Sequence, residues 1–110
     1  MSIGGIRFMW LFVFFDLPTG TKSQRRTASN FRKFLVKDGY CMIQFSVYGR
    51  ICNGQDGVDK HLVRLKNNLP STGHVRSMQI TDLQYSKMQI HVGKKLPQEK
   101  QEKAIQLTFF

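Results

Sequence analysis

The sequence predicts an α+β fold in which two helices cover one face of a mainly antiparallel sheet. Two observations carry this prediction. The hydrophobic pattern changes along the chain from strand-like to helical, to alternating, to helical and back to strand-like. The first of these segments, "RFMWLFVFF", has no charge between Phe8 and Phe15 and is apolar on both faces. A chain of 110 residues has the usual length of one domain and can bury a real core.

Residues 7–15 form the predicted central strand, because a bulky apolar run bounded by turn signals is typical of a strand buried on both faces. The run ends at Asp16, a charged residue that burial does not explain. Pro18 and Gly20 follow it and predict a turn over residues 16–21.

Residues 22–38 have a helical period, with Thr21 suited to cap the start and Gly39 to follow the end. One side of this helix is apolar and the other is cationic. Neighbouring charges of like sign destabilise a helix slightly, so the fold alone does not explain the cations. The apolar side consists of Ala28, Phe31, Phe34 and Leu35, and the cationic side of Lys22, Arg25, Arg26, Arg32, Lys33 and Lys37.

Residues 40–52 alternate in the manner of a strand, but they are too many for one ordinary strand. We therefore predict a bend or a tight hairpin near residues 44–46, and Gly49 is expected to mark a bulge or turn. A second helix is predicted over residues 56–69. Its apolar stripe consists of Val58, Leu62, Leu65 and Leu69.

Residues 74–81 and 88–92 are the remaining predicted strands. The whole order matches a ferredoxin-like βαββαβ sandwich with an extra C-terminal strand. Two helices cover only one face of the sheet, so we expect a second subunit on the other face, in a sheet-to-sheet homodimer. The predicted domain spans residues 1–93, and residues 94–110 form a polar tail.

The charge is strongly positive, with 17 Lys and Arg against 7 Asp and Glu and a formal net charge of +10. Clustered cations favour binding to nucleic acid, because neutralising phosphates releases counterions. An anionic membrane surface is the weaker alternative. The N-terminal apolar run is too short to span a bilayer and lacks a cleavage site, so neither a membrane anchor nor a signal peptide is expected.

Metal-binding motifs of the zinc type are absent from the sequence. Cys41 and Cys52 form no CxxC pair, and His61, His74 and His91 form no HxH or HExxH pattern. We interpret the cysteines as reduced thiols of a cytoplasmic protein and the histidines as ordinary core or surface residues.

Four segments together resemble the CRISPR-associated protein 2 family. The resemblance is greatest to the family members that accompany type II systems. These segments are "FVFFDLP", "RRTASNFRKFLVKDGY", "MIQFSVYGR" and "SMQITDLQYSKMQIHVG", and the resemblance extends over about residues 6–93. It implies a ferredoxin-like homodimer whose last strand extends the sheet of the partner. It also implies an adaptor that lies between two dimers of the CRISPR-associated protein 1 integrase and holds double-stranded DNA during spacer acquisition.

Asp16 has two interpretations. It is either a turn residue that bonds to nearby backbone N–H groups or, as the resemblance implies, the catalytic and metal-binding residue of a nuclease acting on RNA or DNA. One carboxylate is a poor Mg²⁺ site, but a two-fold dimer supplies a second Asp16. We expect this pair near the dimer axis, close to the path of a phosphate backbone.

Two aromatic groups remain. Tyr40, Phe45 and Tyr48 either stack on bases or pack in the core or an interface, and packing is the expectation. The C-terminal residues Leu107, Phe109 and Phe110 are either a plain tail or a docking segment for the integrase.

Three functions follow from the sequence. The leading one is a DNA-binding adaptor for spacer acquisition. The alternatives are a Mg²⁺-dependent endonuclease centred on paired Asp16, and a stand-alone endoribonuclease toxin similar to virulence-associated protein D.

Overall fold

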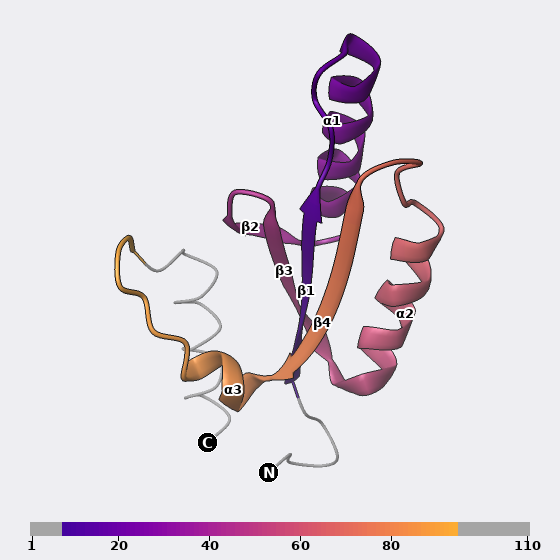
Figure 1. The fold of residues 1–110 in the computed structure, drawn as a ribbon. Helices are drawn as coiled ribbons and strands as arrows, with labels where there is room; N and C mark the ends of the chain where they lie inside the picture. Colours follow the sequence, from indigo (N-terminus) through magenta and orange to yellow (C-terminus); the bar gives the residue numbers. More distant parts are fainter. Residues whose placement is uncertain (1–7, 95–110) are drawn as a thin grey trace.

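The structure, a computed structural model, describes residues 8–94 and shows a four-stranded antiparallel sheet with helices on both faces (Figure 1). The strand order β2-β3-β1-β4 is the order expected of a ferredoxin-like sheet. In chain order, the elements are β1 (Phe8–Asp16), α1 (Lys22–Lys37), β2 (Cys41–Gln44), β3 (Val47–Asn53), α2 (Gly54–Lys66), β4 (His74–Thr81) and α3 (Asp82–Ser86).

The predicted hairpin is confirmed, since β2 and β3 pair through a two-residue turn in which Ser46 has a φ of 65°. The interpretation of Gly49 as a bulge or turn is wrong. Gly49 lies within β3, where a Cβ would come within 2.8 Å of the Phe12 ring. The irregularity lies instead in β2, between Met42 and Gln44.

Helix α1 begins and ends as the sequence predicts. The Thr21 hydroxyl accepts a hydrogen bond from the backbone N–H of Gln24, and the Gln24 side chain accepts one from the backbone of Thr21. Gly39 follows the helix with a φ of 93°. The buried residues Ala28, Phe31 and Leu35 come from the predicted apolar side.

Helix α2 is shorter than predicted at its C-terminal end. Val58 and Leu65 are buried, but Leu69 lies beyond the helix and is 48% exposed. The prediction that Leu69 belongs to the apolar stripe of this helix is therefore wrong. His61 takes its place in the buried face.

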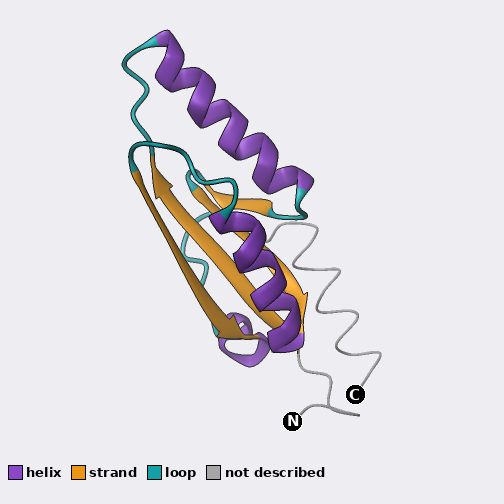
Figure 2. Cartoon of the chain, turned by 90° about the vertical axis from the view of Figure 1, so that its right-hand side faces the viewer, coloured by secondary structure: helices purple, strands orange, loops and turns teal. Residues whose placement is uncertain are grey.

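The main core lies between the sheet and the helices α1 and α2, which cover the same face (Figure 2). Alternate residues of β1 point into this core: Met9, Leu11, Val13 and Phe15. Each fully buried aliphatic side chain contributes about 1.5–3 kcal/mol to the stability of the fold. Because β1 supplies four residues of this core, it is the central strand of the fold.

The other face of β1 is partly covered by α3, which the sequence analysis did not predict. Tyr85 of α3 meets Trp10 edge-on, with ring centroids 3.9 Å apart, and Asp82 accepts a hydrogen bond from Trp10. Trp10 and Phe12 are buried. The expectation that only a second subunit could cover this face is therefore corrected, because the chain itself covers the part next to the N-terminal end of β1.

A patch of this second face extends beyond α3 and consists of Phe14, Val47 and Met78, which we call the open patch. Phe14 and Val47 are half-buried, and Met78 is 51% exposed. Phe12 pairs with Met78 and Phe14 with Val47 across the strands, which places the patch on one continuous surface.

The predicted strand over residues 88–92 is not formed in the single chain. This segment follows α3 without regular structure and pairs with none of the four strands. Met88, Ile90 and Val92 are exposed. A strand needs a neighbour for its backbone groups, and pairing with a second subunit stays a prediction.

A buried polar cluster fixes the end of α1 to β3 and α2. The Asp38 carboxylate accepts hydrogen bonds from His61 (2.8 Å) and Arg64 (2.9 Å), and Arg50 donates to the Asp38 carbonyl oxygen. Burial acts to raise the pKa of Asp38, but the hydrogen bonds from His61 and Arg64 outweigh it and hold the pKa below its ordinary value. His61 is thus a core histidine, as expected.

Candidate nucleic-acid interface and metal site

A stripe of cations runs along the solvent-facing side of α1. At about 100° per residue, its members lie within about 60° of one another and opposite the buried side. The first and last members are 15 residues apart in number, so the stripe is about 22 Å long. We call it the α1 stripe; it consists of Lys22, Arg26, Lys33 and Lys37, all exposed.

The first turn of α1 contains no acidic residue and is instead followed closely by Arg25 and Arg26. Cations near a helix N-terminus oppose the helix dipole at a cost of about 0.3–1 kcal/mol each. Arg25 offsets part of this by donating a hydrogen bond to the Thr19 carbonyl (3.1 Å). Within residues 8–94, Lys22 and Arg26 form no hydrogen bond or ion pair through their side chains. Helix stability therefore does not account for these N-terminal cations, whereas Lys37 in the last turn suits the helix dipole.

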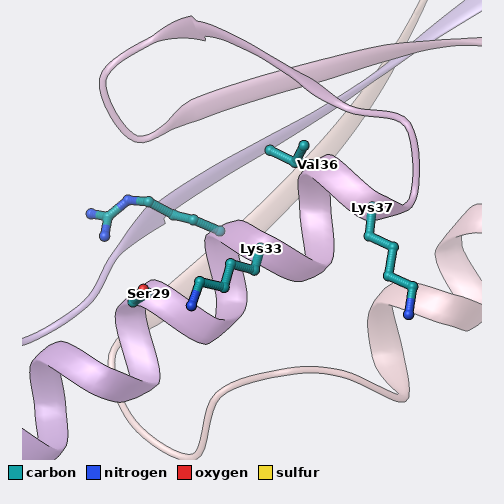
Figure 3. Close-up of a pocket in the computed structure, with 5 residues that line it drawn as sticks. Ser29, Lys33, Val36 and Lys37 are labelled. Atoms are coloured by element: carbon teal, nitrogen blue, oxygen red, sulfur yellow. The ribbon is translucent and has the colours of Figure 1, made fainter.

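An open hollow lies beside the stripe. It is lined by Ser29, Arg32, Lys33, Val36 and Lys37 (Figure 3). Lys33 and Lys37 are one helical turn apart and extend from the same side of α1. The surface of this hollow is formed mainly by the apolar parts of these side chains.

Arg32 differs from the other predicted cations because it lies between two aromatic rings. Its guanidinium carbon is 5.7 Å from the centre of the Phe15 ring and 5.5 Å from that of Phe45. Phe15 is buried, whereas Phe45 is 77% exposed. The pairing joins residues distant in sequence, so no local pattern could reveal it.

The aromatic residues Tyr40, Phe45 and Tyr48 differ in their burial. Tyr40 and Tyr48 are buried in the main core, as expected. Phe45 does not pack in that core, because it lies at the tip of the hairpin between β2 and β3. Of the expected packing in the core or an interface, the core is excluded for Phe45, and an interface stays a prediction.

Asp16 ends β1 and is held there by its neighbours. It pairs with His74 of β4, and the preceding residue Phe15 donates its N–H to the Ser46 carbonyl (3.1 Å). Gly73, with a φ of 92°, passes so close that a Cβ would lie 2.7 Å from the Asp16 carbonyl oxygen. The backbone at Asp16 is thus held by three segments of the chain.

The surroundings of Asp16 suit a shared metal site better than a complete one. Asp16 is exposed, and within residues 8–94 no cation forms an ion pair with it. In the same part of the chain, no group of three or more His, Cys, Asp or Glu residues is placed to hold a metal ion. A single carboxylate leaves most positions around Mg²⁺ to water, so a second chain would have to contribute.

The α1 stripe and Asp16 face opposite sides of the molecule. Asp16 follows Phe12 and Phe14 in the alternation of β1 and lies on their face, away from α1 and α2. The stripe lies opposite the buried side of α1, which faces the sheet. That Asp16 lies close to the path of a bound phosphate backbone stays a prediction.

The predicted docking residues Leu107, Phe109 and Phe110 lie outside the described residues. Cys41 and Cys52 are free thiols, and burial raises the pKa of Cys52. None of the helices between residues 8 and 94 has the length and apolar character needed to cross a membrane.

Comparison with known proteins gives consistent matches. The family model described as CRISPR associated protein Cas2 matches residues 9–88. The chain is 52% identical, over 93% of its length and all of the relative, to the CRISPR-associated endoribonuclease Cas2 of Acidovorax ebreus. It is 45% identical to the protein of that name from Flavobacterium psychrophilum, over 94% of this chain and 90% of the relative. It is 40% identical to the protein of that name from Campylobacter jejuni, over 94% of this chain and 73% of the relative.

Proposed function

Since the chain belongs to the CRISPR associated protein Cas2 family, we propose that it is a cytoplasmic homodimeric adaptor for spacer acquisition. In this role it binds double-stranded DNA and bridges two dimers of the CRISPR-associated protein 1 integrase. The observation that carries the proposal is the α1 stripe, a row of exposed cations on one side of a single helix. The family match favours this function over the stand-alone toxin.

The stripe suits contacts with the DNA backbone. Its side chains are long and flexible, and they project from one side of a single helix over about 22 Å. Lysine and arginine contacts to phosphates position a duplex without reading its sequence. An adaptor that accepts many different spacers needs this kind of contact.

The dimer would form through the open patch. Phe14, Val47 and Met78 leave apolar surface exposed on the face of the sheet that α3 does not reach. The apolar residues Met88, Ile90 and Val92 alternate along the segment after α3, which suits a strand added to the sheet of the partner. This arrangement would bring two Asp16 side chains to the same face.

The test of the adaptor function is a pull-down with the integrase, followed by a spacer-acquisition assay. Wild-type protein should retain the integrase and support acquisition, and protein lacking residues 94–110 reports whether the tail docks. A wild-type dimer that binds neither duplex DNA nor the integrase would overturn the proposal.

A second candidate function is a Mg²⁺-dependent endonuclease, favoured by the exposed Asp16 at the fixed end of β1 and by the relatives named endoribonucleases. Two Asp16 carboxylates in a dimer would hold the ion. Bound Mg²⁺ would supply a Lewis acid that polarises a phosphate and activates water. The Asp16 carboxylates would fix its place at the dimer face.

Asp16→Asn separates the two functions. It keeps the shape of the side chain but removes the charge that binds Mg²⁺. We expect any Mg²⁺-dependent cleavage of RNA or DNA to disappear, while the dimer, duplex binding and spacer acquisition remain. Loss of acquisition with an intact integrase complex would reverse the ranking of the two functions.

A further inference from the structure

Phe45 is an exposed aromatic side chain that neither the core nor the α1 stripe uses. It is 77% exposed at the tip of the hairpin between β2 and β3. Leaving a phenyl ring in water forgoes the favourable burial that the other residues of the core gain. The ring also does not join the open patch, whose members lie within the strands β1, β3 and β4.

The position of the ring is defined by Arg32. The guanidinium carbon lies 5.5 Å from the ring centre, within the range of a cation–π contact. The same guanidinium lies 5.7 Å from the buried ring of Phe15, which anchors Arg32 to the core. Phe45 is therefore an exposed ring with a charged group on one side and solvent on the other.

Cations lie next to this ring. Arg32 also lines the open hollow on α1, together with Lys33 and Lys37. A nucleotide whose base stacks on the ring would therefore lie close to the positive charge of Arg32. The chain carries a net charge of +10, which favours an anionic partner over an apolar protein surface at this position.

We propose that Phe45 is a stacking site for an unpaired nucleobase, next to the positive charge of Arg32. This inference rests on the proposed DNA-binding function and adds a single-stranded segment to the ligand. A side chain inserted between two base pairs of a duplex has to present both of its faces. Phe45 has one face beside Arg32, so it can take one base on its free face.

The test compares a blunt duplex with the same duplex carrying a single-stranded extension that contains the fluorescent base 2-aminopurine. Stacking on an aromatic ring contributes enough per base for about a five- to hundredfold change in affinity. Wild-type protein should bind the extended duplex more tightly by such a factor and should quench the 2-aminopurine fluorescence.

Substitutions at Phe45 isolate the ring. Phe45→Leu keeps an apolar side chain but should lose both the extra affinity and the quenching, whereas Phe45→Trp should keep them. Since the side chain is exposed, neither change should affect folding. Val63→Ala on α2, at a side chain 58% exposed, is the matched control and should behave as wild type.

The blunt duplex measures the proposed function, and the difference between the two DNAs measures this inference. Equal affinity of wild type and Phe45→Leu for the extended duplex, with quenching retained, would overturn the stacking site while duplex binding stands. Dissociation of the dimer by Phe45→Leu, measured by light scattering, would also overturn it, because the ring would then belong to the subunit interface.

Discussion

Removing the charges of the α1 stripe should reduce the salt dependence of duplex binding. The variant changes Lys22, Arg26, Lys33 and Lys37 to Gln, and all four side chains are exposed. Each phosphate contact contributes about 0.9 to the slope of log affinity against log salt concentration. If each of the four contacts one phosphate, the magnitude of the slope should fall by about 3 to 4 per chain bound.

The same variant should fold about as stably as wild type, because removing Lys22 favours α1 and removing Lys37 from its last turn disfavours it by a similar amount. Lys22 and Arg26 lie at the N-terminal end of α1, where each cation costs about 0.3–1 kcal/mol. The capping box of Thr21 and Gln24 is unchanged. An unaltered or increased midpoint in urea unfolding, together with weaker DNA binding, would show that the loss comes from the interface and not from misfolding.

The assay is a titration of a fluorescent duplex at several salt concentrations, for two duplexes of unrelated sequence. Both should lose affinity equally, because phosphate contacts carry no sequence information. The matched control changes four exposed lysines elsewhere to Gln, which lowers the net charge by the same amount. The control residues are Lys60, Lys66, Lys87 and Lys94. An equal fall of the slope in both variants would mean that the total charge, and not the position of the charges, determines DNA binding. That result would refute the assignment of α1 as the interface.

Three further predictions concern assembly and stability. Met78→Glu should convert a dimer of about twice 12.8 kDa into a monomer in light scattering, whereas Val63→Glu on α2 should not. Because the folded pKa of Asp38 is below its ordinary value of 3.8, its ion pairs stabilise the fold above about pH 4 and are lost as the pH falls through the lowered pKa. Asp38→Asn should therefore lower the free energy of unfolding by about 2–4 kcal/mol at pH 7, and the difference from wild type in urea unfolding should shrink as the pH falls through the lowered pKa. Tyr40→Phe should raise the free energy of unfolding by about 1 kcal/mol, because the buried Tyr40 hydroxyl has no hydrogen-bond partner among the described residues; a lower melting temperature would contradict this.

Elements defined by local signals could be predicted from the sequence. The β1 run, the Thr21 cap and the glycine after α1 each act over a few residues, and the structure has them within one residue of the expected place. The helix α3 also had a local signal that was missed. Thr81 and Gln84 form the same capping box as Thr21 and Gln24, directly after a strand.

What the sequence could not reveal depends on contacts between distant segments. The edge-on contact of Tyr85 with Trp10 explains why the second face of β1 is partly covered within one chain. The spacing of Arg32 assigns it to the cationic side of α1. In the structure its guanidinium instead contacts the rings of Phe15 and Phe45. Periodicity assigns a residue to a side of a helix and does not identify its neighbours.

The arrangement of the two candidate sites bears on how adaptor and nuclease functions could coexist. Asp16 and the open patch lie on one face of the sheet, and the α1 stripe lies beyond the helices on the other. A dimer formed through the open patch would enclose the Asp16 pair near its centre while leaving both stripes outside. A duplex held by the stripes would then run past the metal site without entering it. The same geometry that would protect bound DNA from cleavage would require any RNA substrate to reach Asp16 by a different path.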